Sequence, residues 1–520
     1  MVSRDRYPIG QQDFRDLREG GAYYVDKTEF IHKIVTSQSK FYFLARPRRF
    51  GKSLFLSTLR YFFEGRRELF KGLYIHSTDW KWEEYPVLRL DLNTDRYAEN
   101  GQLSVVLDRL LDDWERKFGI SNTYSDPSQR LGKIIESAHE KTGRKVVILV
   151  DEYDKPLVGN MNKVENFEQY RSQLASLYSN FKSSAEHIRL VFLTGVSRFS
   201  RLSVFSDLNN IKDISFSNDF ADICGITEDE LFFYFKEGIE ELAQEYRVSY
   251  ETICRRLKKN YDGYRFAKDG SDIYNPWSIL NALSELRIGN YWNATGSASI
   301  IAEVLRDKNV DIEMTINGRW SLDSLAGLDL MNADPTALLY QTGYLTIADY
   351  DYRNDTVRLK VPNDEVKEGL FKNLLNFYIN VKRGTPSGIV RQILDNINAG
   401  MPELMMKNLE AYFAGIPYDL KMDNENNFQN AIYILLTLIG IDVKTEVHTS
   451  DGRMDILIET TDYIYIMELK YDGSPDEALR QIDRKQYALK FNADIRKLFK
   501  IGVNFSSVPR RIISWKIEER

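Results

Sequence analysis

Gly51, Lys52 and Ser53 stand between an apolar run at 41–45 and a stretch at 53–64 whose apolar residues recur every three or four positions. A helix that begins there offers unpaired N–H groups and a positive dipole end to an anion. The lysine adds charge at the β and γ phosphates, and the serine can ligate Mg²⁺. The segment therefore predicts a phosphate-binding loop, with an ordinary solvated turn as the alternative. The full phosphate-loop pattern has glycine where this chain has Arg46, so the first turn of this loop must differ from that of the usual phosphate loop.

Two further strand ends carry groups that nucleotide hydrolysis needs. The run at 146–150 is followed by Asp151, expected to hold Mg²⁺ through a water, and Glu152, expected to orient and deprotonate the attacking water. The run at 190–194 ends in Thr194, and either Thr194 or Ser197 is expected to sense the γ-phosphate. Because ligands of open α/β sheets bind at the carboxyl ends of the strands, these groups predict an ATPase-type site. The expected nucleotide contacts are Arg46, Arg48, Arg49, Phe50, Gly51, Lys52, Ser53, Asp151, Thr194 and Arg198.

Near the C-terminus, two acids and a lysine recur on neighbouring strand-like runs. Asp455 begins the apolar part of one run, and Glu468 and Lys470 lie two apart on the next, so they share a face. Two carboxylates bind a hard divalent cation, and a nearby lysine can position water for attack on a phosphodiester. This is the PD-(D/E)XK arrangement, although Arg453 and Met454 replace the literal Pro-Asp before Asp455. The plain alternative is an amphipathic hairpin with a charged, solvated face.

The N-terminal motifs closely resemble the bacterial AAA-ATPase-like family over roughly residues 6–290. The resemblance rests on RPRRFGKS at 46–53, in which arginine in place of the first glycine is typical of the family, and on YPIG at 7–10, YVDKT at 24–28, VDEYDKP at 150–156, YDGYRF at 261–266 and YNPWS at 274–278. It implies a P-loop ATPase domain with a helical lid. Asp26 and Lys27 fall in one of these motifs, and their residue types alone suggest no role.

The stretch at about 416–505 resembles the PD-(D/E)XK nuclease domain that is found fused to that ATPase family. A helix-like segment precedes the two strand-like runs, and another, with Gln481, follows them. The resemblance carries over Asp455, Glu468 and Lys470 as metal-binding and catalytic residues, with Glu425 and Gln481 in support and Glu425 as a further candidate metal ligand.

The order of the elements predicts an α/β protein in several parts. Short apolar runs at 41–45, 87–93, 146–150 and 189–194 alternate with helix-like stretches, which indicates a mostly parallel, ASCE-type sheet of a P-loop NTPase. The alternating runs within 338–361, joined at 353–355, predict a hairpin in a winged-helix-like unit. We expect a P-loop domain at 1–225, a helical lid and winged-helix-like region at 226–370, a helical connector at 371–415, and a restriction-endonuclease-like domain at 416–520.

Composition limits the function classes. The 520 residues, 43% hydrophobic and 28% charged, suit an ordinary globular protein, and two cysteines exclude a disulfide scaffold or a cysteine-based zinc site. The metal expected is therefore Mg²⁺ or Mn²⁺. No secretory signal is expected at the N-terminus, and the apolar stretch at 431–441 is far shorter than the roughly 20 residues of a membrane span. We expect a cytoplasmic protein with no membrane partner, and its homo-oligomeric state stays open.

Net charge by itself does not favour a nucleic-acid partner. The total is −6, from 70 basic and 76 acidic residues, but residues 480–520 hold eleven Lys or Arg against four acids. The favoured hypothesis is an ATP-hydrolysing protein that cleaves nucleic acid, more readily DNA than RNA, with a divalent cation. The alternative is a nucleotide-gated regulatory or assembly switch whose nuclease-like domain binds nucleic acid without cutting it.

Overall fold

The chain forms two compact units in the computed structural model. The structure describes residues 6–93, 97, 102–121, 124–160, 163–197, 211–292, 311–327, 334–379, 387–414, 425–448, 453–508 and 510–520. Unit 1 comprises Met1–Trp292 and Arg319–Glu365, and unit 2 comprises Asn293–Gly318 and Val366–Arg520. The sequence divides the chain more finely, into four regions, and the boundaries between those regions remain a prediction.

Unit 1 is built on a five-stranded parallel sheet in the order β2-β3-β4-β1-β5. Its strands are β1 (Phe41–Ala45), β2 (Val87–Asp91), β3 (Val146–Asp151), β4 (Ile188–Gly195) and the short β5 (Lys212–Asp213). All six residues of β3 are buried, as expected where helices cover both faces of a parallel sheet. Strand β4 lies between β1 and β3, which agrees with the ASCE-type sheet that the sequence predicted. The sequence did not predict β5.

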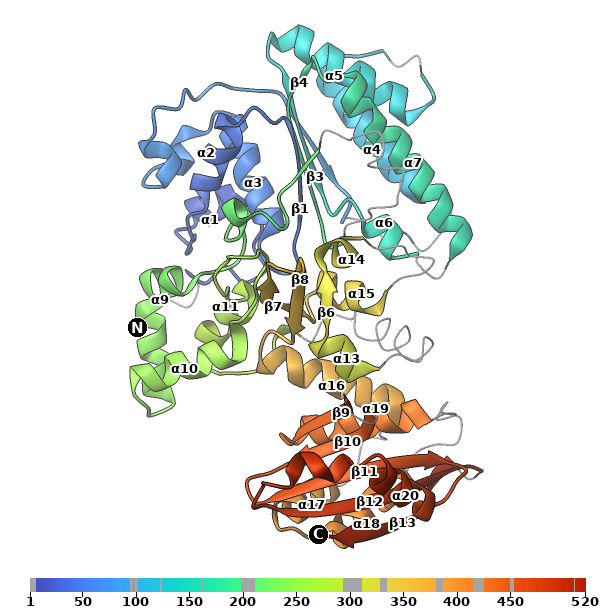
Figure 1. Ribbon diagram of the computed structural model, residues 1–520. Helices are drawn as coiled ribbons and strands as arrows, with labels where there is room; N and C mark the ends of the chain where they lie inside the picture. Colours follow the sequence, from blue (N-terminus) through green and yellow to red (C-terminus); the bar gives the residue numbers. More distant parts are fainter. Residues whose placement is uncertain are drawn as a thin grey trace. The chain divides into compact units, whose positions relative to one another are not determined.

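Helices cover both faces of this sheet, with α1, α2 and α3 on one side and α4, α5 and α7 on the other (Figure 1). The α-helices are α1 (Phe14–Glu19), α2 (Thr28–Thr36), α3 (Lys52–Phe63), α4 (Gln102–Lys117), α5 (Pro127–Thr142), α6 (Lys155–Val158) and α7 (Val164–Ser183). Short 3₁₀ helices are η2 (Arg67–Phe70), η3 (Tyr74–Ser77) and η4 (Asn218–Phe220). The helix predicted at 53–64 is thus confirmed, and it begins and ends one residue earlier than expected.

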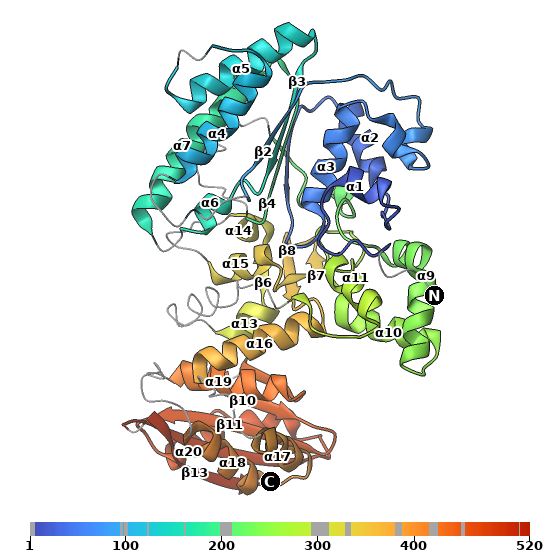
Figure 2. The ribbon, with the colours of Figure 1, turned by 180° about the vertical axis from the view of Figure 1, so that it is seen from behind.

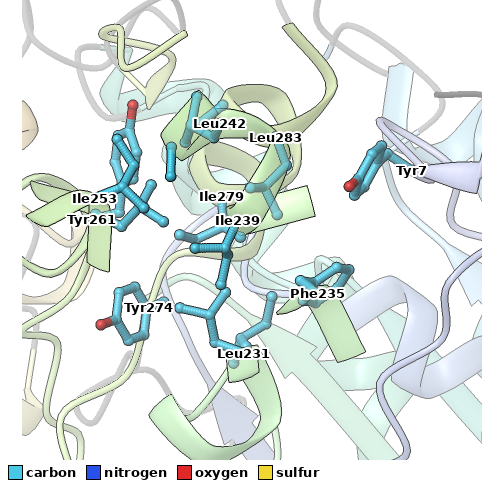
Figure 3. Packing of buried hydrophobic residues seen from close by; sticks show 14 residues of the cluster. Tyr7, Leu231, Phe235, Ile239, Leu242, Ile253, Tyr261, Tyr274, Ile279 and Leu283 are labelled. Atoms are coloured by element: carbon cyan, nitrogen blue, oxygen red, sulfur yellow. The ribbon is translucent and has the colours of Figure 1, made fainter. Parts of the chain in front are cut away.

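The rest of unit 1 is a helical part followed by a small sheet. Helices α9 (Glu228–Glu245), α10 (Tyr250–Tyr261) and α11 (Pro276–Glu285) bury one apolar cluster that also includes Tyr7 of the N-terminal segment (Figure 3). The sequence predicted only helices here, but the loop between α10 and α11 also forms two isolated bridges, Ile226↔Tyr274 and Tyr264↔Ile273.

The predicted winged-helix-like hairpin is confirmed. Helix α14 (Leu322–Ala326) and helix α15 (Pro335–Thr342) accompany an antiparallel sheet in the order β6-β8-β7. Its strands are β6 (Arg319–Ser321), β7 (Thr346–Asp351) and β8 (Thr356–Lys360). Asp351 accepts hydrogen bonds from the backbone N–H of Arg353 and Asn354, which closes the turn at the place that the sequence indicated.

Unit 2 holds a second five-stranded sheet, in the order β13-β12-β11-β10-β9. Figure 2 shows unit 2 from behind, with β10, β11 and β13 labelled. Only β11 and β12 are parallel; the other pairs are antiparallel. The strands are β9 (Asp442–His448), β10 (Arg453–Glu459), β11 (Tyr463–Tyr471), β12 (Lys497–Ser507) and β13 (Arg510–Glu519). The helices are α13 (Ile312–Asn317), α16 (Asp364–Ile379, whose first two residues belong to unit 1), α17 (Ser387–Asn398), α18 (Pro402–Ala414), α19 (Glu425–Leu438), α20 (Pro475–Arg484) and the 3₁₀ helix η7 (Tyr487–Phe491).

The hairpin of β10 and β11 and the buried helix before it agree with the sequence analysis. Strands β12 and β13 were missed, although both alternate apolar and polar residues. Helix α20 packs on β11 and β12, and Gly502 permits this approach because an added Cβ would lie 2.2 Å from the carbonyl oxygen of Pro475.

Candidate functional sites

The predicted phosphate loop connects β1 to α3, as the sequence indicated. Gly51 caps α3 with a left-handed φ of 96°, a conformation that glycine adopts without strain. The buried Lys52 ammonium donates to the carbonyl oxygens of Arg46 and Pro47, at 2.9 and 3.0 Å, and so lies within the curl of the loop. Ser53 follows in the first turn of α3. Burial lowers the pKa of Lys52, while the nearby Glu152 and Asp151 oppose that shift.

Asp151 and Thr194 meet at the adjacent carboxyl ends of β3 and β4. The Thr194 hydroxyl donates to Asp151 Oδ1 at 2.8 Å, and both residues are buried. Because Asp151 also contributes to the electrostatic environment of Lys52, the structure brings these predicted residues of the loop and of the two strand ends together.

Glu152 and Arg49 both have left-handed backbones, with φ of 49° and 69°. Such conformations cost non-glycine residues of the order of 1 kcal/mol or more, and they cluster at functional sites. Glu152 is half-buried directly after β3, which suits a group that must reach water at the edge of the sheet.

Arg46, which replaces the first glycine of the loop pattern, is almost fully buried. Its guanidinium donates to the carbonyl oxygens of Ala45, Ser215, Phe220 and Ala221, at 2.7 to 3.4 Å, and lies over the ring of Phe266. These contacts tie the start of the loop to the segment after β5. A direct phosphate contact of Arg46 remains a prediction, and it would require some of these hydrogen bonds to break.

Arg46→Gly, which restores the usual loop pattern, should lower the free energy of unfolding by about 3 kcal/mol, because buried carbonyl groups lose their donors. Urea denaturation followed by circular dichroism measures the change. The matched control is Arg48→Gly in the same loop, whose side chain is exposed and whose loss should cost under about 1 kcal/mol. Equal stability of the two variants would contradict the structural role of Arg46.

The remaining loop residues contact the helical part of unit 1. The Arg49 guanidinium lies 3.8 Å from the ring centroid of Trp277 and donates to the carbonyl oxygen of Tyr291. Phe50 packs edge-on against Tyr264 and Phe266. The YDGYRF and YNPWS motifs therefore support the phosphate loop. Arg198 lies outside the described residues.

Asp154 was not singled out from the sequence, yet it holds the end of β4. Its Oδ2 accepts hydrogen bonds from the backbone N–H of Val196 and Ser197, at 3.0 and 2.6 Å. The neighbouring Tyr153 hydroxyl donates to the Ser197 carbonyl oxygen. The only sequence signal was its place in the VDEYDKP run. Asp154 is thus a candidate positioning residue for the strand end that carries Thr194.

Asp154 should make stability depend on pH. Burial, helped by repulsion from Glu152, raises its pKa from 3.8 to about 6. A raised pKa means that the folded state holds the proton more tightly than the unfolded chain, so this stabilising contribution is complete below about pH 4 and is lost as pH rises through 6. Between pH 4 and 7, the unfolding free energy of Asp154→Asn should therefore fall less than that of wild type, with a difference on the order of 2–3 kcal/mol.

Urea denaturation at a series of pH values measures this effect. Asp79→Asn, at an exposed position of the same unit, should keep the wild-type pH profile. A wild-type profile for Asp154→Asn as well would refute the expected role of burial at Asp154.

The Asp26-Lys27 pair, for which the residues alone suggested no role, joins the N-terminal segment to other parts of unit 1. The Lys27 ammonium lies 2.6 and 2.7 Å from the two carboxylate oxygens of Glu230, the residue that closes the capping box of α9. Asp26 accepts hydrogen bonds from Thr28 and from the backbone N–H of Tyr74. The contacts identify a structural role for both residues.

In unit 2, the register of the hairpin brings the predicted acids together. Ile456 of β10 pairs with Met467 of β11, so Asp455 and Glu468 are the next residues on either strand. Lys470 lies two residues further along the same face. Asp455 Oδ2 accepts a hydrogen bond from the Leu469 N–H at 2.7 Å, which fixes its carboxyl group against β11.

Glu468 is completely buried, because it follows Ile464 and Ile466 on the face of β11 that packs against α20. Its Oε1 lies 3.2 Å from the Lys470 ammonium, while its Oε2 is buried and accepts no hydrogen bond from the described part of the chain. Burial, followed by repulsion from Asp455, raises the pKa of Glu468 to about 8.

Asp455 and Glu425 share this electrostatic environment. Burial raises the pKa of Asp455 to about 6, with a further contribution from Glu425, which begins α19. Burial also raises the pKa of Glu425, and Lys470 opposes that shift. The site therefore gathers three carboxyl groups that are hard to ionise together, with one lysine among them.

Two glutamines support these acids from neighbouring helices. The side chain of Gln429, in α19, donates to the Asp455 carbonyl oxygen at 2.8 Å. Gln481, in α20, hydrogen-bonds the Tyr487 side chain, whose hydroxyl in turn donates to the carbonyl oxygen of Arg453. Gln481 was expected in a supporting place. Gln429 was missed, because a glutamine within an apolar helix carries no distinctive signal.

The donor set fits a hard divalent cation at Asp455 and Glu468, because the unpartnered Glu468 Oε2 and a second carboxyl group offer oxygen ligands. Among the residues that the structure describes, no three His, Cys, Asp or Glu side chains form a metal-binding group. Water and substrate would therefore complete the coordination of such a cation, and Glu425 as a ligand remains a prediction.

The basic residues near the C-terminus are partly engaged within unit 2. Lys500 forms ion pairs with Asp483 and Glu518, and Lys516 pairs with Asp476. Arg496 and Lys497 also pair with acids. The local excess of positive charge thus contributes less to an outer basic surface than its count suggests.

These two sites and their folds define a P-loop NTPase joined to a restriction-endonuclease-like domain. Residues 8–205 match the family model described as a predicted AAA-ATPase, and residues 423–515 match the PD-(D/E)XK nuclease superfamily. The matched segments include Lys52, Asp151, Asp455 and Glu468.

One relative matches the chain over nearly all of its residues. The chain is 33% identical over 536 residues to the "Uncharacterized protein in vnfD 5'region" of Azotobacter chroococcum mcd 1, and the match covers 99% of each chain. The protein therefore belongs to this family, in which an AAA-ATPase-like domain precedes a C-terminal PD-(D/E)XK nuclease superfamily domain. In the described residues, no helix is both long enough and apolar enough to span a membrane.

Proposed function

We propose that the protein hydrolyses ATP in unit 1 and, coupled to that turnover, cleaves phosphodiester bonds of nucleic acid in unit 2. The observation that carries the nuclease half is the buried Glu468 carboxyl group, which has one oxygen beside the Lys470 ammonium and the other without a hydrogen bond in the described residues. Such an oxygen is costly unless a ligand satisfies it. We expect DNA as the preferred substrate and a cytoplasmic setting.

In the proposed nuclease site, Asp455 and Glu468 hold the cation and Lys470 positions the attacking water. Bound Mg²⁺ or Mn²⁺ would neutralise charge on the phosphate and lower the pKa of water. Leu469 and Gln429 keep the Asp455 segment in place through the hydrogen bonds described above.

In the proposed ATPase site, Lys52 and the N-terminus of α3 bind the phosphates, with Ser53 and Asp151 at the cation. Glu152 orients and deprotonates the attacking water, and Thr194, whose hydroxyl donates a hydrogen bond to Asp151, is the proposed sensor of the γ-phosphate. Arg48, Arg49 and Arg198 are the proposed sources of positive charge for the transition state.

The contacts of Lys52 also support a second candidate, a nucleotide-gated switch. Its ammonium donates hydrogen bonds to two carbonyl oxygens of its own loop. For Lys52 to bind a phosphate, phosphate oxygens must replace those carbonyl oxygens, and the loop must rearrange. In such a switch, unit 2 would bind nucleic acid without cutting it.

Incubation of the full chain with plasmid DNA, single-stranded DNA and RNA tests the two candidates. Each substrate is given Mg²⁺, Mn²⁺ or EDTA, with and without ATP, and both cleavage and phosphate release are measured. The proposed function requires cation-dependent cleavage and ATP turnover, with cleavage altered by ATP. Tight ATP binding without phosphate release, even with nucleic acid present, would favour the switch; turnover without cleavage of any substrate would remove the nuclease half.

A further inference from the structure

The buried carboxyl group of Glu365 ties together two places where the chain passes from unit 1 to unit 2. These places follow Trp292 and Glu365 itself, the last residues of the two segments of unit 1. The backbone N–H of Trp292 donates to Glu365 Oε1 at 2.9 Å, and the N–H of Tyr291 donates to the same oxygen. One carboxylate oxygen thus joins both exits of the chain within unit 1. We refer to Tyr291, Trp292 and Glu365 as the junction.

Glu365 lies in the first turn of α16 and is 1% exposed. Its second oxygen, Oε2, accepts a hydrogen bond from the hydroxyl of Ser278 in α11, at 2.7 Å. Burial raises the pKa of Glu365, and its three hydrogen bonds and the nearby Arg49 oppose that shift. A buried carboxyl group is costly unless its oxygens have partners. These contacts therefore keep the Glu365 side chain in place.

The phosphate loop contacts the junction through Arg49. Its guanidinium donates to the carbonyl oxygen of Tyr291 at 3.2 Å, so the backbone of Tyr291 connects Arg49 to Glu365. The guanidinium also lies over the ring of Trp277, the residue before Ser278. Arg49 is thus linked to both oxygens of the Glu365 carboxyl group, through Tyr291 and through the Trp277-Ser278 segment.

A second contact between the phosphate loop and the junction passes through Gly343. An added Cβ at Gly343 would lie 2.7 Å from Pro47 Cβ in the loop and 3.5 Å from the ring of Trp292. Tyr344, the next residue, packs edge-on against Trp292. Because packed interiors leave few voids, a rearrangement of the loop must change the contacts of the junction.

We infer that the junction transmits the nucleotide state of the phosphate loop to unit 2, with Glu365 as its positioning residue. The inference rests on the proposed function and adds the means by which ATP regulates cleavage. Arg49 is a proposed source of positive charge for ATP hydrolysis, and a guanidinium that turns to a phosphate leaves the carbonyl oxygen of Tyr291. The junction then has one arrangement with nucleotide and another without it. Because α16 continues from Glu365 into unit 2, the difference reaches unit 2 at the start of that helix.

The test compares the rates of plasmid cleavage by the full chain with and without ATP, in Mg²⁺ or Mn²⁺. In wild type we expect ATP to change the rate by about fivefold or more. Glu365→Ala removes the acceptor of all three hydrogen bonds, so its two rates should agree within about twofold. Its ATP hydrolysis alone and its cleavage without ATP should both remain near their wild-type rates, because Glu365 lies in neither proposed site.

Two further variants make the comparison specific. Glu365→Gln should keep the ATP effect, because its amide group can accept from both N–H groups and donate to Ser278. Glu245→Ala, at an exposed position of α9, is the matched control and should keep the effect too. Circular dichroism shows whether Glu365→Ala is folded. If it is not, Glu365→Asp decides by the same comparison, since its carboxylate is one methylene too short to reach all three donors.

The outcomes separate the junction from the proposed function. A wild-type ATP effect in Glu365→Ala, or a lost effect in Glu365→Gln, would overturn the role of Glu365 and leave the proposed function standing. Loss of ATP hydrolysis by folded Glu365→Ala would also overturn that role, because Glu365 would then only support the phosphate loop. Wild type that lacks ATP turnover, cleavage or a response of cleavage to ATP would instead overturn the proposed function itself.

Discussion

Asp455→Asn is expected to abolish cleavage of nucleic acid, reducing its rate by about a thousandfold or more. The substitution removes the negative charge that would bind the cation but keeps an oxygen that can accept from the Leu469 N–H at the same place. The hairpin should therefore stay folded. Plasmid nicking in Mg²⁺ or Mn²⁺, quantified on gels, measures the loss.

The control is Asp442→Asn, at an exposed acid that begins the neighbouring strand β9. It should cleave at the wild-type rate. ATP hydrolysis by Asp455→Asn, measured alone, should also remain, because the substituted residue lies in unit 2 and the proposed ATPase residues in unit 1. If Asp455→Asn cut plasmid as fast as Asp442→Asn, the assignment of the nuclease site would fail.

Glu152→Gln should lower the rate of ATP hydrolysis by about a hundredfold to a thousandfold without weakening ATP binding. The amide cannot take a proton from the attacking water, but it keeps the size of the side chain and can still hydrogen-bond. Lys52 and the N-terminus of α3, which bind the phosphates in our proposal, are unchanged. Steady-state phosphate release and ATP titration measure the two properties separately.

Glu140→Gln, at an exposed position of α5, is the matched control and should leave both properties at their wild-type values. A Glu152→Gln variant that hydrolysed ATP at the rate of this control would exclude Glu152 as the general base. Loss of ATP binding together with hydrolysis would show that Glu152 acts by holding the site together.

The two candidate sites differ in how their acids are held. Asp151 is paired with the Thr194 hydroxyl inside the parallel sheet of unit 1, whereas Glu468 has an unpartnered oxygen in the described residues and a raised pKa. A bound cation should therefore lower the pKa values of the acids in unit 2 strongly. Its charge would offset the repulsion between the carboxylates, and it would give the unpartnered Glu468 oxygen a ligand.

Local patterns in the sequence were sufficient to predict the elements that carry chemistry. The strand before Gly51-Lys52-Ser53, the strand that ends at Asp151 and the hairpin with Asp455 and Glu468 are all present in the structure. Their signals are contiguous in the chain: a buried strand is an apolar run, and residues two apart on a strand share a face. Strand β5 was missed because it is two residues long, whereas β12 and β13 were missed although their apolar and polar residues alternate.

The tertiary structure alone decided what the side chains contact. Arg46 was expected at the nucleotide, but it donates hydrogen bonds to backbone carbonyl groups some 170 residues away in the chain. Asp154, which the sequence did not distinguish, accepts the hydrogen bonds that hold the end of β4. Lys27 finds Glu230, and the motifs around Tyr264 and Trp277 meet the phosphate loop. The physical reason is that such contacts join residues distant in sequence, whose pairing depends on how the whole chain packs. The sequence by itself therefore determined which elements carry the candidate catalytic groups, and the packing of the folded chain decided which other residues contact those groups.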